Sequence, residues 1–249
     1  MIADCNFVLA TDLDGTFLGG TDTDRARLYS WIERERAPIG LIFVTGRDPG
    51  FIAELCDGTG VPWPDFVVGD VGTTIAVTAP AARDDRIRPI AALEAEIAAL
   101  WGDSGPAVRT ALDGHPGLTL QPTEFRYRVS YDFDPAAFCD SAIDKVAELG
   151  LDHLISADRF FDVLPRGVSK GPSLRRLISH LGIDAARVLV AGDTLNDLSM
   201  LDSGLNAVAV GGSEPALLDR IRDRKSVYRA NGIGAAGIVE AIDHFNLTL

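Results

Sequence analysis

A short apolar run, Phe7-Val8-Leu9-Ala10, leads almost directly into the segment Asp12-Leu13-Asp14-Gly15-Thr16. The run shows no alternation of apolar and polar residues and ends at a turn, so it predicts a strand buried on both faces, as in a parallel sheet. Asp12 and Asp14 would then stand at the carboxyl end of that strand, where open α/β sheets bind ligands. Two carboxylates held this close repel each other unless a cation lies between them. The segment therefore predicts a site for a hard metal ion such as Mg²⁺, with one carboxylate free to attack an electrophile.

Two simpler structures would account for the same residues. Asp and Gly favour turns for reasons of their own, so the segment could be an ordinary turn. It could also open a calcium-binding loop, but the regularly spaced acids and the distant Glu of an EF-hand do not follow it. The rest of the chain decides between these interpretations.

Strand and helix patterns alternate in the first and last thirds of the chain. After a flap at 15–20, the first third predicts a helix near 24–35, a strand at 41–44, a helix near 51–56 and a strand at 66–68. The last third predicts helices at 169–181, near 195–201, at 214–222 and near 235–245, with strands at 188–191 and 207–210. This alternation predicts an α/β fold, a Rossmann-like parallel sheet with helices on both faces.

The middle of the chain has a different pattern. It predicts a helix at 91–101, a loop at 102–117, a helix at 135–149 and strands at 126–133, 151–156 and 160–164. In the strand at 126–133, polar Arg126, Arg128, Ser130 and Asp132 alternate with Tyr127, Val129, Tyr131 and Phe133, as in a half-exposed antiparallel strand. We therefore expect a discontinuous core, 1–79 and 167–249, with an α+β domain inserted at 80–166.

Composition narrows the partners and the compartment. A net charge of −13 argues against binding to the phosphate backbone of nucleic acid. Cys5, Cys56 and Cys139 are odd in number and widely spaced, which indicates reduced thiols rather than a disulfide framework. No apolar stretch is long enough to span a bilayer, and the segment around Asp4 lacks the basic region of a signal peptide. We expect a cytoplasmic protein with neither nucleic-acid nor membrane partners.

Two further motifs could bind an anion. Thr45-Gly46-Arg47 follows the strand at 41–44, so its hydroxyl and backbone amides could hold a phosphate, although a plain strand-to-helix turn would look the same. Lys170 lies in the first turn of a predicted helix, where a cation is unfavourable unless an anion also binds there. A lysine that points into water would cost little, so its position alone does not decide.

The last motif, Gly192-Asp193-Thr194-Leu195-Asn196-Asp197, follows the strand at 188–191. Asp193 is a candidate for the second carboxylate that binds the metal ion. Asp197 could orient a metal ligand without contacting the ion itself. Capping of a helix by Asp193 or Thr194 would explain one acid, but not both acids together with Asn196.

In this order, DxDGT, TGR, a Lys that opens a helix and GDxxND resemble the motifs of the haloacid dehalogenase (HAD) superfamily of phosphatases, over the whole chain. The position of the inserted domain resembles the C2B cap of the sugar-phosphate phosphatases in that superfamily. Segments 70–75, 164–171 and 234–242 are similar to segments of sucrose-6-phosphate phosphatases, and mannosylfructose-phosphate phosphatases share them.

The resemblance implies roles for these residues. Asp12 would be the nucleophile that takes the phosphoryl group as an aspartyl-phosphate, and Asp14 would protonate the leaving sugar oxygen and then activate water. The implied Mg²⁺ site consists of the carboxylates of Asp12 and Asp193 and the backbone carbonyl of Asp14, supported by Asn196 and Asp197. Thr45, Gly46 and Lys170 would hold the phosphate oxygens. Further substrate contacts would come from Arg47, Gly72 and Thr73 and, in the cap, from Arg128 first and then Arg126, Gln121 and Glu124.

Alternatives remain for the cap residues and for the function. A solvated polar face would explain the cap residues equally well. The implied function is a Mg²⁺-dependent phosphoric monoester hydrolase for a sugar phosphate, with sucrose 6-phosphate first and a mannosylfructose phosphate or another sugar phosphate as the alternative. A phosphomutase, a phosphoryl transferase or a non-catalytic sugar-phosphate-binding subunit could use the same fold.

Overall fold

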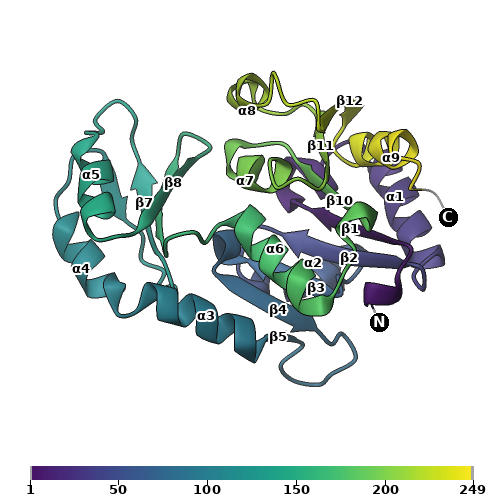
Figure 1. Cartoon of the computed structure of the whole chain (residues 1–249), viewed down its shortest axis with the longest axis horizontal. Coiled ribbons are helices and arrows are strands. Elements are labelled where there is room, and N and C mark those ends of the chain that lie inside the picture. Colours follow the sequence, from purple (N-terminus) through teal and green to yellow (C-terminus); the bar gives the residue numbers. More distant parts are fainter. Residues whose placement is uncertain (1, 248–249) are drawn as a thin grey trace. The chain divides into compact units, whose positions relative to one another are not determined.

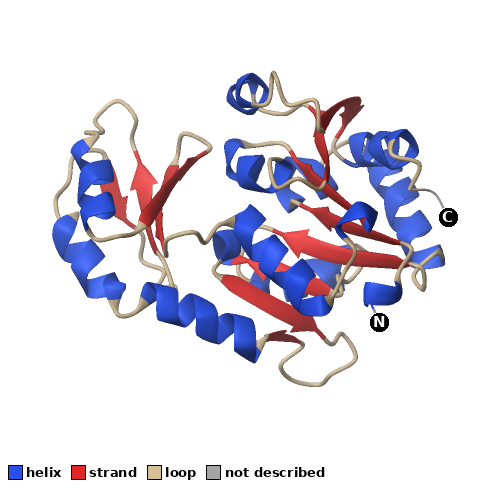
Figure 2. Cartoon of the chain, viewed as in Figure 1, coloured by secondary structure: helices blue, strands red, loops and turns tan. Residues whose placement is uncertain are grey.

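The computed structural model of the chain describes residues 2–247. The chain divides into two compact units: one comprises the residues up to Ile90 together with those from Lys170 on, and the other comprises Ala91–Ser169. Figure 1 labels most elements of both units, and Figure 2 distinguishes their helices from their strands. The predicted insertion at 80–166 overlaps the second unit, whose first residue follows a short strand that belongs to the sheet of the first unit.

The first unit is built on one mixed sheet with the strand order β12-β11-β10-β1-β2-β3-β4-β5. Neighbouring strands from β12 to β3 run parallel. Strand β4 pairs antiparallel with β3, and β5 pairs antiparallel with β4. The strands are β1 (Phe7–Thr11), β2 (Ile39–Val44), β3 (Phe66–Gly69), β4 (Thr74–Thr78), β5 (Ile87–Pro89), β10 (Val188–Gly192), β11 (Asn206–Gly211) and β12 (Val227–Ile233). The chain proceeds from β1 to β2 on one side and returns to β10 on the other, so the strand order reverses at β1. The carboxyl ends of β1 and β10 therefore flank the crevice where such sheets bind ligands.

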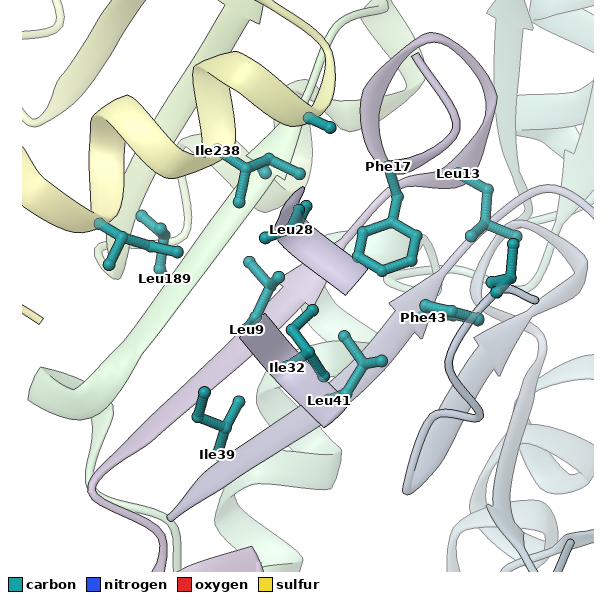
Figure 3. Packing of buried hydrophobic residues seen from close by; sticks show 14 of the residues in the cluster. Leu9, Leu13, Phe17, Leu28, Ile32, Ile39, Leu41, Phe43, Leu189 and Ile238 are labelled. Atoms are coloured by element: carbon teal, nitrogen blue, oxygen red, sulfur yellow. The ribbon is translucent and has the colours of Figure 1, made fainter. Parts of the chain in front are cut away.

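Helices cover the sheet and bury its apolar residues. They are α1 (Asp22–Arg34), α2 (Pro49–Thr59), α6 (Lys170–Leu181), α7 (Leu198–Leu201), α8 (Pro215–Arg220) and α9 (Ala235–His244). Leu9, Leu41 and Leu189 from the sheet pack with Leu28 of α1 and Ile238 of α9 in one buried cluster (Figure 3). Helices α6 and α7 contact each other, and β3, β10 and β11 contact one or the other of them. The buried strands thus hold the loops at their carboxyl ends on a rigid base.

Local signals explain where two of these helices begin. Thr21 caps α1 by accepting the amide hydrogen of Asp24, whose carboxylate in turn accepts the amide hydrogen of Thr21. Asp48 caps α2 in one direction only: its side chain accepts the amide hydrogens of Gly50 and Phe51. These caps follow directly after loops of the site, so they also fix where those loops end.

The second unit is an α+β domain with an antiparallel sheet of strand order β6-β7-β9-β8. Its elements are α3 (Ala91–Trp101), α4 (Ser104–Ala111), β6 (Leu118–Leu120), β7 (Val129–Phe133), α5 (Ser141–Glu148), β8 (Asp152–Ser156) and β9 (Phe160–Leu164). Val129, Tyr131 and Phe161 from one face of the sheet pack with Val108 of α4 and Val146 of α5. The alternation seen in the sequence of β7 therefore separates a core face from a polar face.

The structure corrects the predicted loop at 102–117, which contains α4. Gly105 and Pro106 made this segment look irregular, but both lie in the first turn of the helix. Proline is tolerated there because the amide that it lacks would have no partner within the helix.

Further element predictions need correction. The predicted strand at 126–133 is a strand only from Val129 on, and the helix expected at 135–149 begins only at Ser141. Strands β4, β5, β6 and β12 were not predicted. In β12 the polar and glycine residues give no strand signal, and only its pairing with β11 orders it.

Two expectations on composition can be compared with the structure. No disulfide joins the cysteines within residues 2–247. None of the helices in that range is both long and apolar enough to cross a membrane.

Candidate active site

The candidate site lies where β1 and β10 end side by side in the first unit. Thr11 of β1 is paired in register with Ala191 of β10, and the amide of Asp12 donates to the carbonyl of Ala191 over 2.9 Å. Asp12 and Asp193, which are far apart in the sequence, thereby meet at one edge of the sheet. Each of Asp12, Asp193 and Asp197 offers one carboxylate oxygen, and these three oxygens lie within 4.8 Å of one another.

Lys170, the first residue of α6, connects the parts of this site. Its side chain is fully buried, and its Nζ donates to Oδ1 of Asp12 over 2.6 Å, of Asn196 over 2.7 Å and of Asp197 over 2.7 Å. These bonds use all three hydrogens of the ammonium group. Burial alone would lower the pKa of Lys170, but the carboxylates of Asp12 and Asp197 outweigh it and raise that pKa. The lysine is therefore a fixed positive charge and not the solvent-exposed lysine that its sequence position also allowed.

Asp197 holds the loop after β10 in place. Its Oδ1 accepts from Lys170, while its Oδ2 accepts the amide hydrogens of Asp193 and Thr194, each over 3.0 Å. The oxygen of Asn196 is likewise engaged, since it accepts from Lys170 and from the hydroxyl of Thr194. In this arrangement both side chains orient Lys170 and the loop, and the carboxylate oxygens of Asp197 have hydrogen-bond donors in place of a metal ion.

The hydrogen-bonding groups of Asp193 can be followed one by one. Its amide donates to Asp197, its carbonyl accepts from the amide of Glu214 over 2.8 Å, and its Oδ1 accepts from the hydroxyl of Thr16 over 2.6 Å. In the part of the chain that the structure describes, Oδ2 of Asp193 has no donor, and neither has Oδ2 of Asp12. These two open oxygens belong to the three carboxylates grouped around the site.

The carboxylates lie in surroundings that disfavour their charged forms. Burial raises the pKa of Asp193 to about 6, and the neighbouring carboxylates of Asp197 and Glu214 act in the same direction. Burial also raises the pKa of Asp12 well above its usual range, against the opposing effect of Lys170. A divalent cation bound to the open oxygens would offset this cost, and oxygen donors are the ligands that Mg²⁺ prefers. The donor set of the site therefore fits Mg²⁺.

Asp14 has its carboxylate turned toward Arg47. Nε of Arg47 donates to Oδ2 of Asp14 over 2.9 Å and Nη2 donates to Oδ1 over 3.1 Å, so the pair is bidentate. The guanidinium group also lies over the ring of Phe51, 4.5 Å from its centre. Arg47, predicted as a substrate contact, is thus paired with the predicted acid and base.

Thr45 and Gly46 lie in the loop after β2. Thr45 is buried, and its hydroxyl oxygen accepts the amide hydrogen of Arg47 over 3.1 Å. Among residues 2–247 that hydroxyl donates to no acceptor, so its hydrogen is available to an anion. A side chain on Gly46 would meet only Val71, at 3.8 Å, so the backbone of Gly46 is open to a ligand.

Gly72 and Thr73 are placed against α6. The carbonyl of Gly72 accepts from the hydroxyl of Ser173 over 2.7 Å, and the hydroxyl of Thr73 donates to the carbonyl of Asp70 over 3.0 Å. The carbonyl of Gly72 thus anchors the helix that carries Lys170, whereas the hydroxyl of Thr73 closes its own turn. The contact of both residues with substrate stays a prediction. Ser173 was not singled out from the sequence, because a serine inside a helix gives no signal of its own.

Carboxylates within the second unit already engage most of the predicted sugar-contacting side chains. Gln121 donates to Asp132 over 3.0 Å, Arg126 pairs with Glu94, and Arg128 pairs with Asp162 over 3.3 Å, whereas Glu124 is exposed. Arg128 is 6% exposed, so it does not belong to a solvated face. Arg128 departs from the expected solvated face because it pairs with Asp162, which is itself buried. Burial raises the pKa of the Asp162 carboxyl group. A role of these residues in reading a sugar stays a prediction.

Known proteins resemble this chain over nearly its whole length. The sequence profile described as Sucrose-6F-phosphate phosphohydrolase matches residues 5–246. The chain is 42% identical over 240 residues to glucosylglycerol-phosphate synthase of Pseudomonas anguilliseptica; the match covers 96% of this chain but spans only 30% of that protein. It is 26% identical over 251 residues to mannosylfructose-phosphate phosphatase of Agrobacterium fabrum, with 96% of this chain and 97% of that protein covered. The crystal structure of the sucrose-phosphatase of Synechocystis sp. PCC6803 in complex with sucrose and phosphate superposes with a TM-score of 0.86 at 26% identity, covering 97% of this chain and 98% of that one.

Proposed function

The chain belongs to the sucrose-6F-phosphate phosphohydrolase family, and from this premise we propose that it is a Mg²⁺-dependent phosphatase that hydrolyses a sugar phosphate through an aspartyl-phosphate. Members of this family are HAD-type phosphoric monoester hydrolases with a cap domain. One observation carries the proposal for this chain: the buried ammonium group of Lys170 fixes Oδ1 of Asp12 beside Asp193, while Oδ2 of each aspartate stays open. A nucleophilic carboxylate, a positive charge for the phosphate and oxygen donors for a metal ion thus occur together.

In the proposed first step, the carboxylate of Asp12 attacks phosphorus, and the bond between phosphorus and the sugar oxygen breaks. Asp14 gives its proton to the leaving sugar oxygen, so free sugar departs and the phosphoryl group stays on Asp12. The guanidinium group of Arg47 occupies both oxygens of the ionised Asp14 carboxylate, so Asp14 must first leave Arg47 and take up a proton from water before this transfer. In the second step water attacks the phosphoryl group, Asp14 takes up its proton, and inorganic phosphate leaves with Asp12 restored.

Other residues stabilise the charge that develops in both steps. The hydroxyl of Thr45 and the backbone of Gly46 would hold the phosphoryl oxygens, and Lys170 would join them by exchanging one of its three present acceptors for a phosphoryl oxygen. Asp12, Asp193 and the backbone carbonyl of Asp14 would hold Mg²⁺, and its charge, when bound, would neutralise part of the charge on the phosphate.

We place sucrose 6-phosphate first among the substrates, because of the family and the likeness to the sucrose-phosphatase of Synechocystis. The identity of 42% to glucosylglycerol-phosphate synthase supports glucosylglycerol phosphate as a second candidate. Mannosylfructose phosphate is a third, through the phosphatase of Agrobacterium fabrum. All three are phosphate monoesters of a small glycoside, so one reaction mechanism serves them all.

Release of inorganic phosphate from these esters tests the proposal. We expect the wild-type chain to release phosphate in MgCl₂ but not in EDTA, and Asp12→Asn to be inactive in both. Asp219→Asn, which removes an acid from the exposed face of α8, should keep wild-type activity and serves as the control for charge. Full activity of Asp12→Asn would contradict the assigned nucleophile. Binding of the esters without turnover by the wild type would instead favour a non-catalytic subunit.

Water labelled with ¹⁸O separates hydrolysis from phosphoryl transfer. A hydrolase incorporates one labelled oxygen into the phosphate that it releases. A mutase or transferase passes the phosphoryl group to a sugar hydroxyl and leaves the label in the water.

A further inference from the structure

Glu214 forms two hydrogen bonds with the loop that carries Asp193, one to the residue before Thr194 and one to the residue after it. Its amide donates to the carbonyl of Asp193 over 2.8 Å, and its Oε2 accepts the amide hydrogen of Leu195 over 3.0 Å. Glu214 comes from the turn between β11 and α8, so the loop after one strand is held by the loop after the neighbouring strand.

The turn that carries Glu214 is itself fixed. The hydroxyl of Ser213 donates to the carbonyl of Val210 at the end of β11 over 2.6 Å, and Ser213 is buried. Pro215 follows directly and disfavours helical angles for Glu214, whose φ of −54° and ψ of 135° are those of extended backbone. The carbonyl of Glu214 then accepts the amide hydrogen of Leu218 and starts α8. The position of the carboxylate is therefore tied to the strand and not to a flexible loop.

Glu214 completes the hydrogen bonding of the Asp193 loop. Asp197 accepts the amides of Asp193 and Thr194, and Thr16 donates to one oxygen of the Asp193 carboxylate. The carbonyl of Asp193 and the amide of Leu195 remain, and both of their bonds go to Glu214. Without its carboxylate, the amide of Leu195 would have to find another acceptor, and one side of the loop would be free to move.

We propose that Glu214 is a positioning residue for the metal ion: it sets the backbone of the Asp193 loop so that the open carboxylate oxygen is in place before the ion binds. This inference rests on the proposed function, because it concerns the same Mg²⁺ site. Glu214 is not one of the grouped carboxylates, so it would act through Asp193 and Leu195. Partners of this kind orient the ligands of metal sites, and their loss weakens metal binding without removing a ligand.

Isothermal titration of the full chain with MgCl₂, without substrate, tests this role directly. We expect Glu214→Ala to raise the Kd for Mg²⁺ about tenfold, at the lower end of the range for such partners. Glu214→Gln should stay near the wild type, because its amide oxygen can still accept from Leu195. Asp219→Asn removes one negative charge from α8 without touching the loop, so it is the matched control and should bind like the wild type.

Two results would overturn the inference. An unchanged Kd in Glu214→Ala would show that the loop does not need the bond. Equal weakening in Glu214→Gln and Glu214→Ala would show that Glu214 acts by its charge alone. If the wild type itself bound no Mg²⁺, the metal site of the proposed function would fail first, and this inference with it.

Steady-state kinetics separate positioning from a general structural role. Positioning predicts a higher Mg²⁺ concentration for half-maximal rate in Glu214→Ala, with kcat restored at saturating Mg²⁺. A fall in kcat that saturating Mg²⁺ does not restore, together with a lower melting temperature, would assign Glu214 to folding instead.

Discussion

Gly15, between Asp14 and Thr16, shows how tightly single residues constrain this site. Its φ of +82° lies in the left-handed region, and a Cβ atom there would lie 2.2 Å from Oδ2 of Asp193. That oxygen is one of the two carboxylate oxygens of the site for which the described residues provide no donor. The glycine therefore serves both the turn and the close approach of the Asp193 carboxylate.

We expect Gly15→Ala to lose at least about 100-fold in kcat, because the new methyl group must displace the carboxylate of Asp193. Gly182→Ala is the matched control: Gly182 has a φ of +67° but nothing within 4 Å of an added Cβ. Each substitution should cost about 1–2 kcal/mol of stability for the left-handed backbone. Phosphate-release kinetics and urea denaturation of both variants check this, and equal activity of the two would refute the clash with Asp193.

The sequence was informative for residues at the ends of predicted elements. Asp12, Lys170 and Asp193 follow apolar strands or open a helix, and the structure does bring them together. Thr16 and Glu214 also hold Asp193, yet neither was given that role. Glu214 reaches the site only because β11 lies next to β10 in the sheet. A local sequence pattern does not indicate the order of strands in a sheet.

At the scale of elements, the contact between α6 and α7 supports Lys170. Gly171 is the second residue of α6, and a Cβ atom on it would lie 2.0 Å from the carbonyl oxygen of Ser199 in α7. Its amide also donates to the hydroxyl of Ser199 over 3.0 Å. The two helices can approach this closely only because residue 171 has no side chain.

We expect Gly171→Ala to destabilise the protein by about 1–3 kcal/mol, the range for an overpacked core. The change should also lower kcat, since the helix that moves carries Lys170. Gly58→Ala is the control: Gly58 lies in α2 with nothing within 4 Å of an added Cβ, so alanine there should stabilise by about 0.5–1 kcal/mol. Urea denaturation followed by circular dichroism measures both values. A Gly171→Ala variant as stable as the Gly58→Ala variant would contradict the proposed packing.

Elements buried on both faces were the easiest to predict. Strands β1, β2 and β10 are continuous apolar runs, and the structure has a strand at each of them. By contrast, α4 was hidden by a proline in its first turn, and β12 is a strand only through its pairing with β11. Their order comes from tertiary contacts, which a reading of local pattern does not contain.

At the scale of the whole molecule, the grouped carboxylates should link stability to metal binding. If Mg²⁺ binds only the folded chain, a concentration of about 100 times the Kd adds about 2.7 kcal/mol, or about 5–10 °C in melting temperature for a chain of this size. We expect this rise when EDTA is replaced by MgCl₂. Differential scanning calorimetry measures it.

Asp193→Asn is the control for that measurement. It should show a much smaller rise with Mg²⁺ and, in EDTA, a melting temperature no lower than that of the wild type, because it removes one of the crowded negative charges. A rise in Asp193→Asn as large as that in the wild type would place the stabilising ion elsewhere.

The central place of β1 in the sheet has a consequence for biosynthesis. One edge of β1 pairs with β2, which follows soon after it on the messenger, while the other edge pairs with β10, which is translated after the whole second unit. Until then the nascent chain displays an apolar strand with unpaired amides and carbonyls, the kind of edge on which polypeptides aggregate. The candidate active site is also completed only when β10 has been synthesised. A ribosome-bound fragment that stops before Val188 should therefore depend on chaperones and be catalytically inactive.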